Sequence, residues 1–141
     1  MSLHSIAAAG LRTISQITKL HELRFDIDHN GLAVTIELLS SSLPGAPVVN
    51  HKGRYVGFIS EFDVLQALES EREIAQLTAK DMMVHDHLAI NISTTIKEAV
   101  QLMKTRHFLV LPVVDKEIVV GCLTRKDLLR AWLGMGLNQP I

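Results

Sequence analysis

Two segments of the sequence place a hydroxyl and a carboxylate three residues apart. Ser60 precedes Asp63, and Thr124 precedes Asp127. At the start of a helix this spacing forms a capping box, in which the two side chains satisfy backbone N–H groups. The same groups can also present hydrogen-bond partners to a ligand at the helix N-terminus, where the dipole favours an anion. Capping alone explains each pair taken singly, but the recurrence of the pair favours ligand binding in at least one segment.

The residues around these pairs also occur twice. Pro47-Val48-Val49-Asn50 recurs as Pro112-Val113-Val114-Asp115. A polar turn follows each, and residues 55–60 are then echoed by residues 119–124, with a Val-Gly pair in both. The copies lie 65 residues apart at the prolines and 64 apart at the aspartates. Two copies at this period predict a duplicated domain with a pseudo-twofold axis, because a solenoid needs shorter and more numerous units.

Each copy predicts a strand, a turn, a second strand and a helix. The Val-Val pairs are β-branched and bounded by turn residues, as strands are, and helical apolar spacing follows both aspartates. A further helix precedes each strand pair, entered through Asn30-Gly31 in the first copy and through a Thr95–Glu98 capping box in the second. Its expected apolar face is Leu32, Thr35, Ile36 and Leu39 in the first copy, and Ile96, Ala99, Val100 and Met103 in the second.

The order of these elements predicts a mixed α/β (α+β) fold and a set of boundaries. Residues 1–20 are expected to form an N-terminal helical segment, residues 21–70 the first unit and residues 71–80 a connecting segment that is helical at first. Residues 81–133 form the second unit, and residues 134–141 contain Gly, Asn and Pro and are expected to be a flexible tail. The segments 24–28 and 88–92 are expected to add one short strand ahead of each leading helix.

The full pattern is Pro-Val-Val, a turn, Val-Gly-x-x-Ser/Thr-x-x-Asp and an apolar helix. This pattern resembles the CBS domain, and two copies in tandem resemble a Bateman module. Asp81-Met82-Met83 and Ala99-Val100-x-Leu102-Met103 also look like that family. The resemblance covers roughly residues 15 to 133. It implies two βαββα units around a pseudo-twofold axis.

The resemblance further implies a ligand and the residues that would hold it. Paired CBS units commonly bind AMP, ADP, ATP or S-adenosylmethionine in clefts between the two sheets, with no required cofactor. The family's Asp holds the ribose hydroxyls, and its Ser or Thr contacts phosphate or ribose. A carboxylate suits this role because it can accept from both vicinal hydroxyls, and a charged acceptor strengthens the bonds. The adenine would need an apolar slot with a few backbone partners.

The two copies differ in charge beside the shared motif. Glu61 lies in the first motif, whereas Arg125 and Lys126 lie in the second. A phosphate would be repelled by the first and attracted by the second, although a solvated helix start explains the two basic residues equally well. The predicted principal ligand-binding residues are Thr124, Asp127, Arg125, Lys126, Ile92, Leu111 and Pro112. The predicted secondary site comprises Ser60, Asp63, Ala46 and Pro47.

One position departs from the family pattern. Many members carry a basic residue shortly before the strand proline, where it reaches phosphate. Val110 and Leu111 stand there in the second copy, and Arg106 and His107, a little earlier, are candidates to replace it. This departure bears on binding of a polyphosphate more than on binding of a nucleoside.

Composition excludes several classes of protein. The 141 residues are 48% hydrophobic and 21% charged, with a net charge of −1, which predicts an ordinary globular fold. A protein that grips nucleic acid usually has a strong basic excess, so no nucleic-acid partner is expected. No apolar run is long enough to cross a bilayer, so no membrane partner is expected either. Cys122 is the single cysteine, and a cytoplasmic location is the default expectation.

Other candidate sites have simpler explanations. His85-Asp86-His87 is the only tight histidine cluster and predicts a surface loop rather than a metal site, since no further ligand stands at a suitable spacing. Cys122 follows the strand glycine and is expected to be an inert core residue. No nucleophile is paired with a base, so the sequence does not predict an enzyme.

Two functional hypotheses follow. The first is a stand-alone regulatory CBS pair that binds an adenine nucleotide and signals through a homodimer or an unidentified effector protein. The apolar faces at residues 65–68 and 129–133 are the surfaces expected to pair in a symmetric dimer. The second is a ligand-free scaffold for protein interaction or dimerisation, in which each Ser/Thr-x-x-Asp is only a helix cap.

Overall fold

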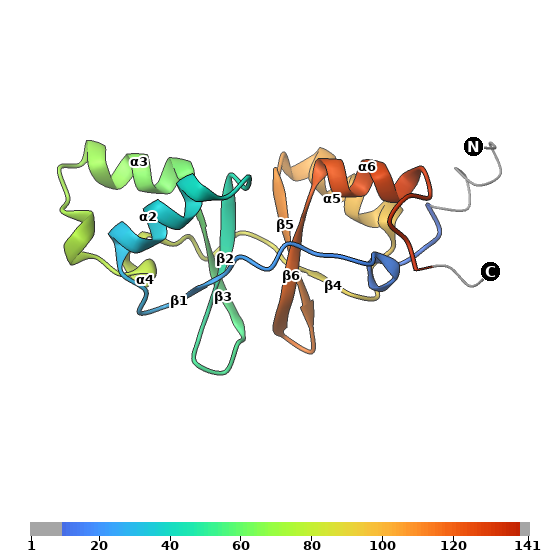
Figure 1. The fold of residues 1–141 in the computed structure, drawn as a ribbon, viewed down its shortest axis with the longest axis horizontal. Coiled ribbons are helices and arrows are strands. Elements are labelled where there is room, and N and C mark those ends of the chain that lie inside the picture. The colour runs from blue at the N-terminus through green and yellow to red at the C-terminus, as the bar shows by residue number, and fades with distance from the viewer. Residues whose placement is uncertain (1–9, 139–141) are drawn as a thin grey trace.

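The structure is a computed structural model that describes residues 10–138, and within them one five-element unit occurs twice (Figure 1). The first unit consists of β1 (Phe25–Asp26), α2 (Gly31–Ser40), β2 (Gly45–Val49), β3 (Tyr55–Ser60) and α3 (Glu61–Glu69). The second consists of β4 (Ile90–Asn91), α5 (Ile96–Arg106), β5 (Val110–Asp115), β6 (Ile118–Thr124) and α6 (Arg125–Trp132). Three short helices lie outside this repeat: η1 (Ile14–Gln16), η2 (Ile74–Gln76) and α4 (Ala79–Met82).

Both units build the same three-stranded sheet. In each, the short first strand runs parallel to the second, and the second pairs antiparallel with the third. Phe25 pairs with Val48 in the first sheet, and Ile90 pairs with Val113 in the second, so the registers correspond. A register shift occurs after each of these valines as well. The predicted tandem βαββα architecture is therefore confirmed, including the short leading strands.

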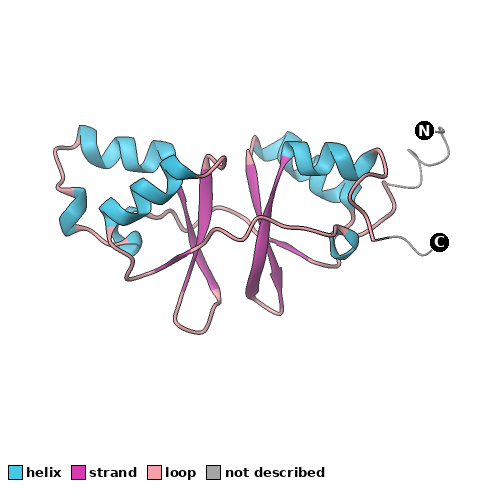
Figure 2. Cartoon of the chain, in the orientation of Figure 1, coloured by secondary structure: helices cyan, strands magenta, loops and turns pink. Residues whose placement is uncertain are grey.

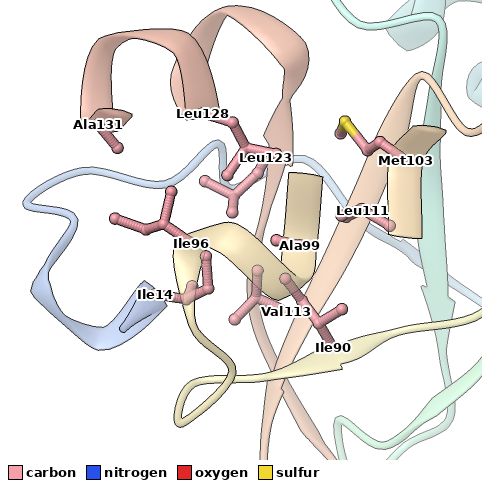
Figure 3. Packing of buried hydrophobic residues seen from close by; sticks show 10 residues of the cluster. All are labelled: Ile14, Ile90, Ile96, Ala99, Met103, Leu111, Val113, Leu123, Leu128 and Ala131. Atoms are coloured by element: carbon pink, nitrogen blue, oxygen red, sulfur yellow. The ribbon is translucent and has the colours of Figure 1, made fainter. Parts of the chain in front are cut away.

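The helices of both units lie at one end of the molecule, and the hairpin turns lie at the other (Figure 2). Each sheet buries one face under its own two helices. In the second unit this core contains Ile96, Ala99 and Met103 of α5, as predicted, against Leu111 of β5 and Leu128 of α6 (Figure 3). The matching core of the first unit is built around Phe25, Val34, Val48 and Ile59. A smaller cluster of Leu43, Phe58, Val110 and Cys122 lies where the two units meet.

The predicted apolar face of α2 is wrong by one residue. Val34 and Leu38 are the buried apolar side chains of this helix, whereas Leu32, Ile36 and Leu39 are 44%, 54% and 76% exposed. The 65-residue offset of the prolines holds at the helix start too, because the cap residues Asn30 and Thr95 are 65 apart. A shift of one residue turns a helix by about 100°, so the predicted inner stripe lies outside.

The segments that precede the two units are exchanged between them. His21, ahead of the first unit, pairs with Cys122 on β6 of the second, and Val84, ahead of the second unit, pairs with Phe58 on β3 of the first. Both pairs form two backbone hydrogen bonds of 2.8–3.1 Å. The leading segment of one unit therefore becomes an edge of the other unit's sheet.

The repeated strand glycines make this exchange possible. A Cβ atom on Gly121 would lie 2.6 Å from Leu20 Cβ and 2.8 Å from the His21 carbonyl oxygen. A Cβ atom on Gly57 would lie 2.5 Å from Met83 Sδ and 2.9 Å from the Val84 carbonyl oxygen. The Val-Gly pair of the motif is thus explained by the close approach of the exchanged segment.

The predicted N-terminal helix is wrong over residues 10–20, and residues 1–9 lie outside the described part of the chain. Here the chain forms only the single turn η1, because its backbone pairs with the second unit instead of with itself. Ile14 N donates to Thr94 O, Ser15 N to Ile92 O, and Ile96 N to Arg12 O. Among the apolar residues of this described segment, Ile14 is buried in the second core, and Ile17 and Leu20 pack against it.

The ends of the other two linking segments also differ from expectation. Helix α3 stops at Glu69, and Glu71 adopts a left-handed conformation, so the predicted helical continuation through Gln76 is absent. The tail from residue 134, which is predicted to be flexible, is hydrogen-bonded to residues 16–18 as far as residue 138. Thr18 N donates to Gly136 O at 2.9 Å, and Asn138 N donates to Gln16 O.

Candidate functional site

The two Ser/Thr-x-x-Asp motifs begin α3 and α6, and both form complete capping boxes. Ser60 N and Oγ donate to Asp63 Oδ2 at 2.8 and 2.9 Å. Thr124 N and Oγ1 donate to Asp127 Oδ2 at 2.7 and 2.9 Å. In return, each Asp donates its backbone N–H to the hydroxyl of the cap residue. One carboxylate oxygen in each motif is thus committed to the cap.

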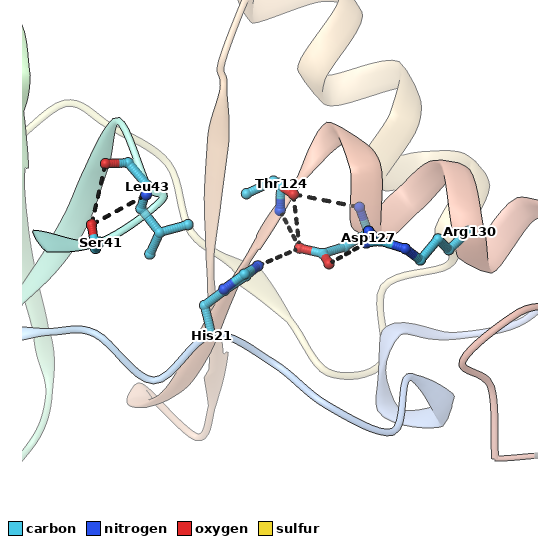
Figure 4. A network of polar contacts seen from close by, with 6 residues as sticks. All are labelled: His21, Ser41, Leu43, Thr124, Asp127 and Arg130. Atoms are coloured by element: carbon cyan, nitrogen blue, oxygen red, sulfur yellow. Dashed lines mark hydrogen bonds and ion pairs between the residues drawn. The ribbon is translucent and has the colours of Figure 1, made fainter.

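Asp127 also contacts residues outside its own motif (Figure 4). His21 Nε2 lies 3.0 Å from Asp127 Oδ2, and Arg130 Nη1 lies 3.4 Å from Oδ1. The Asp127 side chain is only 13% exposed. His21 reaches it because its segment pairs with β6, and α6, which holds Asp127, follows β6 directly. A cation and a histidine therefore hold the second-copy carboxylate in place.

A cavity of about 560 Å³ opens beside Asp127, and we call it the Asp127 cleft. Residues 17–22 form one wall, and α6 together with the tail forms the other. Lys19, His21 and Arg130 line it, together with the acidic Glu22 and Asp127. Its volume lies within the range of about 300–1,000 Å³ that is usual for small-molecule sites. The remaining lining residues are Ile17, Thr18, Leu20, Met135 and Gly136.

A second cavity, of about 220 Å³, lies beside Asp63, and we call it the Asp63 cleft. It lies between the units and is lined by Ser60 and Asp63 of the first. The His87 ring forms part of its wall. This ring is stacked on Phe58 at 3.9 Å and 11°, and on Phe108 at 4.0 Å and 22°. Burial lowers the pKa of His87, although its hydrogen bond to Leu88 O and the nearby Asp86 and Asp63 oppose the shift.

The sequence pattern of the CBS domain matches this chain twice, over residues 26–70 and 79–134. Each match covers one of the two units. The units have similar but separate cores, the same sheet topology and the same capped motif. The chain belongs to the CBS domain family. Its two units form a CBS pair, as the sequence resemblance predicts.

Relatives share the CBS region of this chain. An uncharacterized protein of Methanocaldococcus jannaschii is 30% identical over 100 residues, which are 70% of this chain and 24% of that protein. Inosine-5'-monophosphate dehydrogenase of Helicobacter pylori is 31% identical over 87 residues, which are 61% of this chain and 17% of the enzyme. The chain spans about a quarter or less of the length of these curated relatives.

Solved CBS-pair structures share the whole arrangement. CBSX2, a CBS-pair protein of Arabidopsis thaliana, has been solved in complex with AMP. It is 25% identical to this chain with a TM-score of 0.74, and the alignment covers 87% of this chain and 97% of that one.

The CBS pair brings only part of the predicted principal site together. Asp127 lines its cleft, whereas the Thr124 hydroxyl is engaged in the cap. Leu111 and Pro112 are buried within the second sheet, and Ile92 packs against the second core, so none of the three lines the cleft. Arg125 lines a different groove, between α5 and α6, and Lys126 is exposed beside neither carboxylate.

The predicted secondary residues divide in the same way. Ser60 and Asp63 line the Asp63 cleft, whereas Ala46 and Pro47 are buried within the first sheet. The basic candidates ahead of the second strand proline lie on the Asp63 side of the CBS pair. His107 lines that cleft, and the Arg106 guanidinium lies 5.6 Å from the centre of the Phe108 ring.

Sequence reasoning missed two histidines for the same reason. His21 and His87 stand on the exchanged segments, so neither is near its carboxylate in the sequence. His85 and Asp86 are exposed, but the prediction of a surface loop is wrong for the His87 side chain, which is half-buried between two phenylalanines. The repeat pattern carries no signal for a contact between one unit and the other unit's leading segment.

The remaining features are structural. Cys122 is fully buried, as predicted, and burial raises the pKa of its thiol to about 12. Within residues 10–138, no group of three or more metal-binding side chains is arranged to hold an ion. No helix in the same range is long and apolar enough to cross a membrane.

Proposed function

We propose that this CBS pair is a regulatory module that binds an adenosine-containing nucleotide in the Asp127 cleft. The observation that carries the proposal is the cleft itself. It is large enough for a small molecule and presents a carboxylate beside Lys19, His21 and Arg130. The AMP complex of the related CBSX2 supports an adenine nucleotide as the ligand class.

The polar groups of the Asp127 cleft suit the two charged ends of a nucleotide. Asp127 is the acceptor for the ribose hydroxyls, and it is held in place by the cap and by Arg130. Lys19 and Arg130 supply the positive charge for a phosphate, in place of the Arg125 and Lys126 predicted from the sequence. The apolar lining from Ile17, Leu20 and Met135 suits a base.

The role of this site is binding rather than catalysis. The Asp127 carboxylate is held by the cap, His21 and Arg130. These contacts fix it as a hydrogen-bond acceptor and do not leave it free to act as a general base. The Asp63 cleft is lined by both units, and the Asp127 cleft is lined by the second unit and by the segment that leads into the first. A ligand that prefers one relative arrangement of the units would therefore shift the population toward it.

The output surface proposed here is the outer face of the helices, which pairs with a second copy of the chain. Phe62 and Leu65 of α3 are 73% and 57% exposed, and Leu129 of α6 is 63% exposed. The outward stripe of α2 extends this surface in the first unit. In the second unit, an apolar groove of about 670 Å³ runs between α5 and α6, lined by Leu109, Leu129 and Trp132 among others. In a symmetric dimer, each copy would bury these exposed apolar faces against the same faces of the other copy.

Light scattering tests the dimer. We expect wild type to have the mass of a dimer and both Leu65→Glu and Leu129→Glu to have the mass of a monomer, because a charge would be placed in an apolar contact. Gln101→Glu adds the same charge on the exposed side of α5 that lies away from the groove with α6, and it is expected to stay dimeric. A monomeric wild type would overturn this surface.

Isothermal titration with AMP, ADP, ATP and S-adenosylmethionine tests the ligand. We expect at least one of them to bind at one equivalent per chain. The alternative is a ligand-free scaffold, which the complete capping boxes favour. That alternative predicts no heat with any of the four ligands and a loss of about 1 kcal/mol in unfolding free energy for Asp127→Ala.

A further inference from the structure

The Asp63 cleft contains a stack of three aromatic rings with an imidazole in the middle. Phe58 comes from β3 of the first unit, and Phe108 comes from the α5–β5 connection of the second. His87 enters between them from the segment that joins the units. Both ring-to-ring distances, 3.9 and 4.0 Å, are those of stacked pairs, so removing the imidazole would leave a gap one ring thick.

The backbone beside His87 holds the ring in this gap. Tyr55 Oη donates to the His87 carbonyl oxygen at 2.6 Å. His87 Nδ1 lies 3.1 Å from the carbonyl oxygen of Leu88, which can only accept, so Nδ1 is the donor. The neighbouring His85 and Asp86 are exposed and pack into no cleft. The inward position is therefore specific to His87.

The gap leads directly to the polar groups of the first motif. Ser60, Asp63, His87 and Phe108 line one cavity, and Pro44 and Val84 complete its apolar walls. A planar heteroaromatic base in place of the imidazole would have a phenylalanine on each face. The sugar attached to it would lie on the side of Asp63, which is half-buried.

We propose that His87 is a built-in competitor for the base slot of the Asp63 cleft, so that a nucleotide binds there only when the imidazole leaves the Phe58–Phe108 pair. This inference rests on the proposed nucleotide-binding function and assigns the regulation of its second site. With the imidazole in the slot, the space left in the Asp63 cleft is about 220 Å³. Affinity for the closed cleft is reduced by the fraction of molecules in which it is open.

Isothermal titration of AMP into four variants tests the proposal. His87→Ala is expected to raise the stoichiometry from one to two per chain, with the new site binding about tenfold or more tightly than in wild type, because two stacked contacts no longer compete. His87→Phe keeps a ring in the slot and is expected to stay at one. His85→Ala removes an exposed histidine from the same loop and is also expected to stay at one. Adding Asp63→Asn to His87→Ala is expected to remove the new site.

The outcomes separate this inference from the function on which it rests. A folded His87→Ala variant with the stoichiometry of wild type overturns the inference, even if AMP binds beside Asp127. Binding of AMP to His87→Ala but not to wild type supports the inference and overturns the proposed Asp127 site. The stack is checked independently of these variants by the ¹H chemical shifts of the His87 ring in wild type. Both neighbouring phenylalanines should move them upfield, and ordinary imidazole shifts would overturn the stack.

Discussion

The two clefts of this CBS pair have the same capped motif and differ in the histidine that the exchanged segment brings to them. At Asp127 the histidine contacts the carboxylate from the edge, and the cavity stays open at about 560 Å³. At Asp63 the histidine lies in the middle of an aromatic stack, and the cavity beside it measures about 220 Å³. Identical motifs therefore do not make equivalent sites, because the other half of each cleft comes from a segment outside the motif.

The charges of the two clefts differ in the same direction. Lys19 and Arg130 line the Asp127 cleft, whereas no lysine or arginine of the described residues lines the Asp63 cleft. The predicted charge difference between the copies therefore still favours the Asp127 cleft. Lys19 and Arg130 produce it, instead of Arg125 and Lys126. Arg125 and Lys126 precede Asp127 in the sequence, yet α6 directs them away from its cleft.

The largest expected effect is on the free energy of unfolding, when the strand glycine of each unit is replaced by alanine. Gly121→Ala is expected to lower the unfolding free energy by about 3 kcal/mol, because its Cβ would meet Leu20 Cβ and a carbonyl oxygen that cannot move alone. Gly57→Ala is expected to cost less, about 1–2 kcal/mol, because its nearest contact is the flexible Met83 side chain. Urea denaturation measures both. Equal losses would show that the two exchanged segments are held equally tightly.

The next largest effect concerns the carboxylates. Asp127→Asn keeps an oxygen for the cap but removes the charge, and it is expected to weaken AMP binding by about 2 kcal/mol, or roughly 30-fold. Asp63→Asn is the matched change in the other motif and is expected to leave AMP binding within about twofold of wild type. Titration calorimetry measures both. The choice of the Asp127 cleft would be wrong if the two substitutions had the same effect or the opposite order.

The smallest effect is the pH dependence of the stacked histidine. Because burial lowers the pKa of His87 in the folded protein, the unfolded chain takes up a proton first as pH falls below about 6.5. Stability from the neutral ring is fully present above that pH and is lost on acidification. Asp86 and Asp63 offset part of this loss, Arg106 adds to it, and His107 faces the same cavity.

The measurement is the unfolding free energy from urea curves at pH 7.5 and pH 5.5. Wild type is expected to lose more stability than His87→Phe between these values, by up to about 1 kcal/mol, because the side chain is only half-buried. The other histidines are common to both proteins and cancel in the difference. An identical loss in both would show that His87 does not titrate from a buried, neutral state.

The fold could be predicted because the same pattern of residues occurs in both units. The Pro-Val-Val strand, the Val-Gly strand and the capped helix occur in both copies, so each copy supports the interpretation of the other. The predicted face of α2 is wrong because the two copies differ in turn length. The offset between the copies is 64 residues at the aspartates but 65 at the prolines and at the helix caps, so the 64-residue offset points to Leu32, Ile36 and Leu39 instead of the buried Val34 and Leu38.

The candidate site could be predicted only in part, because its halves come from distant segments. Asp127 and Asp63 are recognisable from their own motifs. His21 lies 106 residues from Asp127 and is brought to it by pairing of the exchanged segment, which no local pattern encodes. The apolar spacing of the N-terminal segment predicts a helix, yet over residues 10–20 its backbone bonds to the second unit instead.

A crystal structure of the protein with AMP tests the central claim most directly, which is that the Asp127 cleft is the open site and the Asp63 cleft is occupied by the protein's own side chain. We expect AMP beside Asp127, with its ribose on the carboxylate and the His87 ring still between Phe58 and Phe108. AMP bound beside Asp63 in wild type, with His87 displaced and the Asp127 cleft empty, would contradict it.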